Sequence, residues 1–184
     1  MKRIIALSSA IPWLIFFIFP CALAATDPFV CDGPGFRYTT TAPEGWKLDN
    51  EAGKLNSLCL VSYPKEGSWK GSDTVIYIDA TPRGDIKGAP NLAKMMAFDI
   101  KSHKKKSPKL KVVKGKSISN FRRKIPVRYF MNDSAFGNSE AVAYIDEKAA
   151  VVFVVMTSRS ELGFKRSLPA FKKIVENYRH VSPY

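Results

Sequence analysis

The chain has 184 residues, and its 29 lysines and arginines against 16 aspartates and glutamates give a formal net charge of +13. No segment repeats with a period of roughly 20 to 50 residues, and no low-complexity linker divides the sequence. These properties exclude a repeat array and argue against two domains, and the length fits one domain with a single core.

The first 24 residues have the three parts of a cleavable secretory signal peptide. Lys2 and Arg3 supply the positive start, an apolar run follows, and Ala22 and Ala24 precede the expected cleavage point. The apolar run contains Pro12 and is shorter than the roughly 20 residues that a membrane-spanning helix needs. We therefore expect export to a periplasm or to the medium, with residues 25–184 forming a single α+β domain.

Two cysteines remain after the signal peptide is removed. An isolated pair in an oxidising compartment is typical of a disulfide, so we predict a bridge between Cys31 and Cys59. Reactive or metal-binding thiols would need a partner that lowers their pKa or a cluster of ligands, and the chain has only two histidines. Lipidation at Cys21 is not expected, because Pro20 precedes it where lipoprotein signal peptidases require a small residue.

Short strands separated by turns are predicted in the first half of the exported chain. An arm rich in proline and glycine spans 27–35. The period-2 patterns and turn residues predict strands over 36–41, 46–48, 57–63 and 74–81. The turn at 64–72 carries Trp69, which we expect to be exposed or half-buried and which is a candidate contact for a partner.

The pattern changes to a helical period after Asn91. Leu92, Met95, Met96 and Ile100 fall on one face of a predicted helix that begins just after Pro90. This face is interpreted as part of the core. A face that carries methionines is also suited to binding an apolar ligand or partner.

The second half is predicted to contain four more strands and a closing helix. The strands span 112–118, 125–132, 140–146 and 149–157, and the last is apolar on both faces, as in a central strand. A tight turn at 146–148 joins the last two. The closing helix is predicted to begin near Ser167, because Pro169 is tolerated only in a first turn, and it places Leu168, Phe171 and Val175 on the sheet.

This order of elements describes an α+β domain with a mainly antiparallel sheet packed against helices. Gly-Phe-Arg-Tyr at 35–38, Ala-Pro-Glu-Gly-Trp at 42–46, the helix after the early strands and the final helix with phenylalanines resemble the Mog1/PsbP-like superfamily. The resemblance implies an αβα sandwich and a non-catalytic binding or accessory role. It supplies no catalytic residues, because the superfamily has no shared set.

The excess positive charge is concentrated in one segment. Without Lys2 and Arg3, the chain has 27 basic against 16 acidic residues, and the rest of the exported chain is balanced. A concentrated positive potential attracts polyanions, which makes the segment a candidate anion-binding surface. Its eleven basic residues, with no acidic residue among them, are Lys101, Lys104, Lys105, Lys106, Lys109, Lys111, Lys114, Lys116, Arg122, Arg123 and Lys124.

Two interpretations of this basic segment stay open. The lysines are either a solvated helix end, loop and edge strand protected against aggregation, or a binding surface. For an exported protein, the expected partners are anionic lipid, lipopolysaccharide, an acidic glycan or an acidic protein, and peripheral membrane association is included among them. Nucleic acid is less available outside the cytoplasm.

Motifs for enzyme chemistry are weak in this sequence. Gly115-Lys116-Ser117 lacks the upstream glycine of a P-loop, and His103 and His180 are expected to be exposed, without a nucleophile beside them. Asp79, Asp85 and Glu140 are carboxylates that nothing in their spacing selects. The sequon at 132–134 matters only where secreted proteins are glycosylated. We predict no catalytic residues, no metal site and no cofactor.

The leading hypothesis is an exported, non-enzymatic binding module that uses its basic surface. The alternatives are a small exported hydrolase with an unrecognised site and an assembly partner of an envelope complex that uses Trp69. A deep pocket that holds carboxylates, or a histidine with a displaced pKa, would favour the hydrolase.

Overall fold

The computed structural model describes residues 29–33, 36–83, 91–121, 123–133 and 138–181. The predicted signal peptide, Pro90, Asp85, Arg122 and Ser134 of the glycosylation sequon lie outside these ranges.

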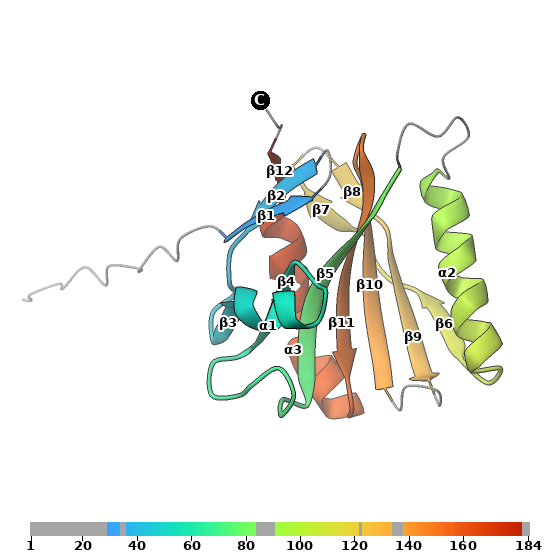
Figure 1. The fold of residues 1–184 in the computed structure, drawn as a ribbon. Helices are drawn as coiled ribbons and strands as arrows, with labels where there is room; N and C mark the ends of the chain where they lie inside the picture. The colour runs from blue at the N-terminus through green and yellow to red at the C-terminus, as the bar shows by residue number, and fades with distance from the viewer. Residues whose placement is uncertain (1–28, 34–35, 84–90, 122, 134–137, 182–184) are drawn as a thin grey trace, which may run out of the picture.

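A seven-stranded sheet forms the centre of the molecule (Figure 1). Every pair of neighbouring strands is antiparallel. This arrangement confirms the predicted α+β class. The strands, in their order across the sheet, are β3 (Trp46–Asp49), β4 (Leu60–Pro64), β5 (Thr74–Pro82), β11 (Ala150–Ser158), β10 (Asn138–Asp146), β9 (Val127–Asp133) and β6 (Lys111–Lys114).

Strand β11 occupies the middle of this sheet, as its apolar sequence predicted. Side chains at alternate positions point to opposite faces of a strand, so a central strand needs apolar residues at both parities. Val152 and Val154 lie in the core of one face, whereas Val155 lies in a second cluster on the other face. Helix α3 (Glu161–Asn177) covers the first face and α2 (Leu92–Lys106) the second, which gives the predicted αβα sandwich.

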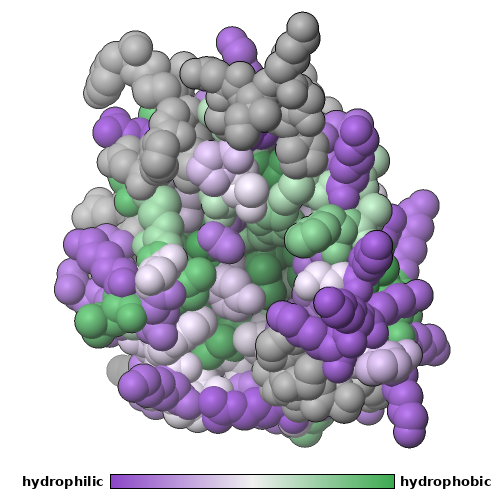
Figure 2. All heavy atoms as spheres, turned by 45° about the vertical axis from the view of Figure 1, so that its right-hand side comes forward, coloured by the Kyte–Doolittle hydropathy of each residue, from purple (hydrophilic) through white to green (hydrophobic). Residues whose placement is uncertain are grey.

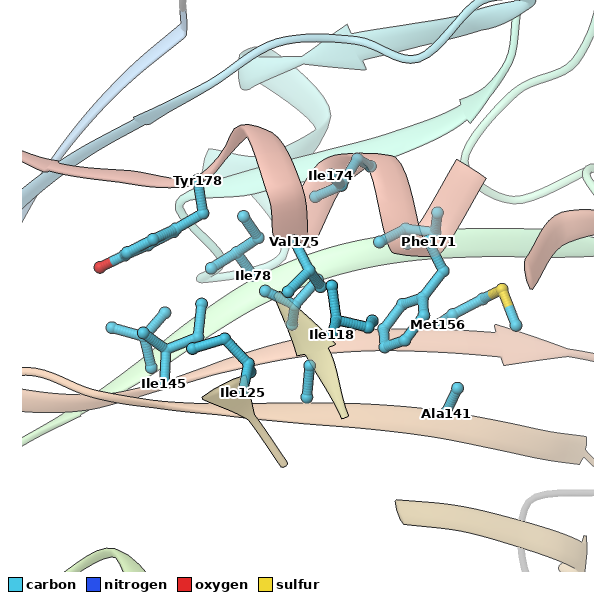
Figure 3. Close-up of a cluster of buried hydrophobic side chains, with 14 of the residues drawn as sticks. Ile78, Ile118, Ile125, Ala141, Ile145, Met156, Phe171, Ile174, Val175 and Tyr178 are labelled. Atoms are coloured by element: carbon cyan, nitrogen blue, oxygen red, sulfur yellow. The ribbon is translucent and has the colours of Figure 1, made fainter. Parts of the chain in front are cut away.

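Helix α3 supplies most of the helical contribution to the main core. Figure 3 shows Phe171 and Val175 directed at the sheet, where Ile78 and Met156 meet them, and Ile174 belongs to the same buried cluster. All five side chains are almost completely buried. Burying a residue of this kind contributes about 1.5–3 kcal/mol, so this interface accounts for much of the stability of the domain.

The start of α3 differs from the prediction. The helix begins at Glu161, after an N-cap by Ser160, whose side chain accepts a hydrogen bond from the Gly163 N–H. Pro169 therefore lies inside the helix, where it removes one backbone hydrogen bond. Its exposed position lets solvent satisfy the freed carbonyl, and the buried face on either side keeps the helix continuous.

Two small sheets complete the fold. One contains β1 (Phe29–Gly33), β2 (Phe36–Thr40) and β12 (Arg179–Val181), and the other contains β7 (Ile118–Asn120) and β8 (Arg123–Ile125). The arm over 27–35 was not among the predicted strands because it is rich in proline and glycine, but it contains β1, which pairs with β2 along its whole length. Local glycine and proline content does not reveal such a pairing, because the partner strand supplies the hydrogen bonds.

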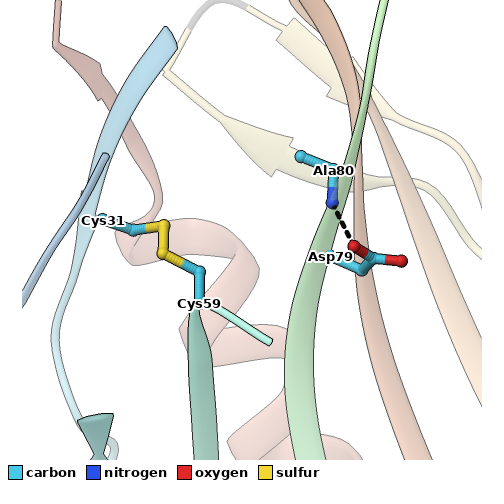
Figure 4. Close-up of a disulfide and its surroundings, with 4 residues drawn as sticks. All are labelled: Cys31, Cys59, Asp79 and Ala80. Carbon is cyan, nitrogen blue, oxygen red and sulfur yellow. Dashed lines mark hydrogen bonds between the residues drawn. A yellow bond between two sulfur atoms is a disulfide. The ribbon is translucent and has the colours of Figure 1, made fainter. Parts of the chain in front are cut away.

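The predicted disulfide between Cys31 and Cys59 is present and joins β1 to the segment just before β4 (Figure 4). The Cys31 side chain is buried in the main core, so the bridge fastens the small sheet to the large one. The two Cα atoms are 5.9 Å apart, within the usual range for a disulfide.

Gly115 divides the single strand predicted over 112–118 into β6 and β7. A Cβ atom at this position would lie 2.9 Å from the Val127 side chain and 3.0 Å from that of Tyr129. The Gly115 N–H donates to the Val127 carbonyl, so the chain passes close to β9 where it leaves the sheet. Only glycine leaves room for this approach.

A six-residue helix, α1 (Asn50–Leu55), was not predicted from the sequence. Asp49 caps it by accepting a hydrogen bond from the Ala52 N–H. Helices this short show too little periodicity for recognition from sequence. Within the described ranges, none of the three helices has the length and apolar character to span a membrane.

The side chain of Asn120 closes the C-terminal end of α3. Its amide nitrogen lies 2.6 Å from the carbonyl oxygen of Val175, 3.3 Å from that of Glu176 and 2.9 Å from that of Tyr178. The last carbonyls of a helix have no partner within the helix, and here a buried residue from a distant strand supplies it.

Replacing both cysteines, Cys31→Ser with Cys59→Ser, is expected to lower the free energy of unfolding by about 3.5 kcal/mol, because the bridge closes a loop of 28 residues in the unfolded chain. Urea unfolding of the oxidised protein and of the double variant measures this difference. A loss below about 1 kcal/mol would show that the bridge does not restrict the unfolded chain.

Asn120→Ala is expected to cost roughly 1–3 kcal/mol of unfolding free energy, because it leaves buried carbonyl groups at the end of α3 without a donor. Asn120→Asp should cost more, since a carboxylate would face the same carbonyl oxygens. Urea unfolding of both variants tests this, with the neighbouring exposed change Ser119→Ala as the control. Equal stabilities for the alanine and aspartate variants would contradict the capping role.

Candidate functional site

Helix α2 packs loosely on its face of the sheet. None of its side chains is fully buried, and Leu92, Met96 and Ile100 are only partly buried against the sheet cluster. Phe98 is 70% exposed. The interpretation of the apolar face as ordinary core is therefore wrong for Met95, which lines a cleft beside the helix.

The cleft has a volume of about 490 Å³ and lies between α2 and strands β5, β11 and β10. Figure 2 shows this face of the molecule, where apolar side chains line a central hollow and hydrophilic side chains border it. A volume of this size is typical of sites for small molecules. The lining residues are Tyr77, Asp79, Thr81, Met95, Phe98, Asp99, His103, Glu140, Val142, Phe153, Val155 and Thr157.

The register of three strands sets the floor of this cleft. Tyr77, Val155 and Val142 lie side by side on β5, β11 and β10, and form an apolar row across its middle. Glu140 lies beyond one side of this row, next to Thr157, and Asp79 lies beyond the other side, next to Phe153. The floor is therefore apolar in the middle and carries a carboxylate at two opposite corners.

His103 connects α2 to the sheet through two carboxylates. Its Nε2 atom lies 3.2 Å from Glu140 Oε2 on β10, and its Nδ1 atom lies 3.2 Å from Asp99 Oδ1, one helical turn earlier. The imidazole ring also stacks on Phe130, with ring centroids 4.3 Å apart. We call Asp99, His103 and Glu140 the ion triad.

The two carboxylates keep His103 positively charged. Hydrogen bonds from Asp99 first and Glu140 second raise the pKa of the imidazole from 6.5 to about 10, although partial burial opposes this shift. Both ring nitrogens then donate, so neither has a lone pair with which to accept a proton. The prediction that His103 is exposed was wrong, since its side chain is 17% exposed. His180 is exposed on β12, as predicted.

Two tyrosines extend the polar network at the cleft. The hydroxyl of Tyr144 on β10 donates to Asp99 Oδ2 over 2.5 Å. This is a second polar contact between the sheet and α2, beside that of His103 with Glu140. Burial raises the pKa of Tyr77, and the nearby carboxylates of Glu140, Asp79 and Asp99 raise it further. The Tyr77 hydroxyl therefore stays protonated near three negative charges.

Of the three carboxylates considered from sequence, Asp79 and Glu140 line the same cleft, and Asp85 lies outside the described residues. Sequence spacing did not select this pair, because strand register brings the two together across β11. No group of three potential metal ligands suited to a metal ion was found in the described part of the chain.

The basic residues predicted as one surface separate into two groups. The first group is exposed and follows the C-terminal half of α2, the turn after it, the edge strand β6 and the residues just beyond β6; we call it the lysine surface. Its members are Lys101, Lys104, Lys105, Lys106, Lys109, Lys111, Lys114 and Lys116.

The second group lies on β8, which pairs with β7 in a separate two-stranded sheet. Arg123 pairs with Glu147 at 2.9 Å and donates to the Asp146 carbonyl, and Lys124 donates to the Ser119 hydroxyl. These interactions offset the Arg123 charge locally. Arg122 lies outside the described residues.

Trp69 is half-buried, as predicted, in the loop between β4 and β5. Its ring meets that of Tyr77 edge-on, with centroids 6.1 Å apart. Trp69 also lines a second cavity of about 300 Å³, which shares Tyr77 and Thr157 with the cleft. Its role as a partner contact stays a prediction.

Solved structures with a similar fold include LpqN of Mycobacterium tuberculosis, a protein involved in cell envelope biogenesis. It has a TM-score of 0.53 and 15% sequence identity, over 85% of this chain and 90% of that one. Cyanobacterial PsbP (CyanoP) of Synechocystis sp. PCC 6803 has a TM-score of 0.49 and 8% identity, over 89% and 99%. No protein-family model and no curated protein matches the sequence. The likeness to LpqN gives this chain the Mog1/PsbP-like fold that the sequence predicted.

His103→Gln is expected to lower the free energy of unfolding by roughly 2 kcal/mol at pH 6, because it removes a partly buried cation from between two carboxylates. The folded pKa lies above the unfolded value, so this contribution is complete below about pH 6.5 and is lost as the pH rises through about 10. Urea unfolding of wild type and variant at pH 6, 8 and 10 checks this, with His180→Gln as the control. A difference that does not change with pH would contradict the ion triad.

Proposed function

We propose that this protein is an exported, non-enzymatic binding module that uses the lysine surface to bind an anionic component of the cell envelope. The observation that carries the proposal is the exposure of eight lysines along one continuous stretch of structure, from α2 through its turn to β6. Such a concentration of charge raises the local concentration of polyanions and the rate of encounter with them.

The lysine surface keeps most of its charge available. Lys106 has an interaction of its own, and none of the other seven lysines forms an ion pair with a carboxylate in the described part of the chain. Lysines in the last turn also interact favourably with the helix dipole, so α2 tolerates their crowding. The other seven cations therefore remain available to phosphate or carboxylate groups of a partner.

The disulfide supports the exported location. A bridge that fastens two sheets together is typical of proteins that fold in an oxidising compartment. The predicted signal peptide and the likeness in fold to LpqN, an envelope biogenesis protein, support the same location. Whether the protein stays in a periplasm or is released follows from fractionation of the native cells.

A small hydrolase is a second candidate, because the cleft holds carboxylates and a histidine with a displaced pKa. The chemistry of the ion triad favours binding instead. His103 is held as a cation whose two N–H groups face carboxylates, so it lacks the free nitrogen of a general base. No serine or cysteine from the described ranges lines the cleft as a nucleophile.

Replacing Lys104, Lys105 and Lys106 together by glutamate is expected to weaken binding to vesicles that contain phosphatidylglycerol by about 100-fold, since each lysine contributes on the order of 1 kcal/mol at an anionic surface. Wild-type binding should also weaken by at least about tenfold between low and high salt, because exposed charges are screened. Vesicle co-sedimentation measures both effects. Parallel titrations with lipopolysaccharide, heparin and an acidic protein identify the preferred anion.

A matched control replaces three exposed lysines outside the lysine surface, Lys54, Lys65 and Lys173, by glutamate. This variant has the same net charge as the first, so it should retain most of the binding if position matters. Equal losses in both variants, or binding that neither salt nor the first variant alters, would refute the lysine surface as the binding site.

A further inference from the structure

The cleft beside α2 has the opposite charge from the lysine surface. Among the described residues, the carboxylates that line it are those of Asp79, Asp99 and Glu140, and His103 is the single cationic side chain. Three carboxylates less one imidazolium give a formal charge of −2. None of the lysines of the lysine surface lines the cleft. A ligand of the cleft therefore differs in charge from the anionic partner proposed for the lysine surface.

Two carboxylates have an oxygen available to a ligand. In the described part of the chain, Glu140 uses Oε2 for His103, and Asp79 uses Oδ1 for the Ala80 N–H. Glu140 Oε1 and Asp79 Oδ2 have no such partner. Asp99 differs, because Oδ1 faces His103 and Oδ2 accepts from Tyr144.

The surface between these two carboxylates is apolar. Glu140 lies next to Thr157 of β11 and Asp79 lies next to Phe153 of β11. The four positions between Thr157 and Phe153 correspond to about 14 Å along the strand. The floor between them is formed by Tyr77, Val155 and Val142, and Phe98 stands exposed at the helix side. An elongated apolar group lying on this floor reaches a carboxylate at its end.

We propose that the cleft binds a small amphiphile with an elongated apolar body and a protonated amine. The apolar body lies on the floor and against Phe98, and the amine donates to Glu140 Oε1, while the more distant charge of Asp79 adds a weaker attraction for the same amine. Glu140 is 8% exposed, and a charge-assisted hydrogen bond is stronger at such a position than in open water. An anionic amphiphile of the same shape is repelled.

Three ligands that share an eight-carbon chain test the role of charge: octylammonium, octanol and octanoate. Octylammonium and octanoate are titrated into the purified protein below their micelle concentrations and octanol below its solubility limit, with amide chemical shifts as the readout. Octylammonium is expected to bind saturably, about tenfold more tightly than octanol, and octanoate more weakly still. The shifts should map to the cleft rather than to the lysine surface.

Variants separate the amine contact from the apolar contact. Glu140→Gln is expected to weaken octylammonium about tenfold and to leave octanol unchanged. Because Glu140 also holds His103, the exposed Asp79→Asn serves as a second variant, with a loss of about threefold for octylammonium only. Glu66→Gln removes an exposed carboxylate elsewhere and should change nothing. Phe98→Ala should weaken all three ligands by a similar factor.

Equal affinity for the three ligands, or tighter binding of octanoate, both judged from the shifts of cleft residues, would overturn the charge preference. The absence of saturable shifts at the cleft would overturn the site itself. A loss in Glu66→Gln as large as in Asp79→Asn would show that overall charge, rather than the cleft, attracts the amine. None of these results depends on whether the lysine surface binds anions, so the two proposals fail separately.

Discussion

One imidazolium ion determines where α2 lies on the sheet. The helix has no fully buried side chain, so apolar packing alone holds it weakly. His103 joins Asp99 on the helix to Glu140 on β10, and Tyr144 adds a hydrogen bond from the sheet to Asp99. The three residues of the ion triad line the cleft, and Lys101 and Lys104 of the lysine surface flank His103 in the sequence. Both proposed binding surfaces therefore depend on the same partly buried charge.

The two faces of the sheet have different physical roles. On one face, α3 fills the space with Phe171, Ile174 and Val175, and Asn120 closes the end of the helix. That face is densely packed. On the other face, a loosely packed helix leaves a cavity that a ligand can enter. The densely packed α3 face fixes the positions of the strands. The side chains that these strands place on the α2 face are therefore held accurately, and the cleft between them stays open.

Sequence reasoning missed the site for a specific reason. His103 lies within a run of lysines, and such a run predicts an exposed residue. The residue is partly buried because Glu140 and Phe130 come from distant strands that reach it only in the folded chain. The signal that was present is the single histidine four residues after Asp99 on a helix, a spacing that brings the two side chains together. An analysis of hydrophobic periodicity takes no account of this spacing, because neither residue is apolar.

The sequence by itself determined the α+β class, most strands, both long helices, the central position of β11 and the Cys31–Cys59 bridge, because each follows from local periodicity or from residue type. Only the tertiary structure decided three further features. Helix α2 packs loosely on the sheet, Asp79 and Glu140 line the same cleft, and Arg123 forms an ion pair with Glu147. Strand register and side-chain packing fix these relations between residues far apart in the chain, and no local pattern records them.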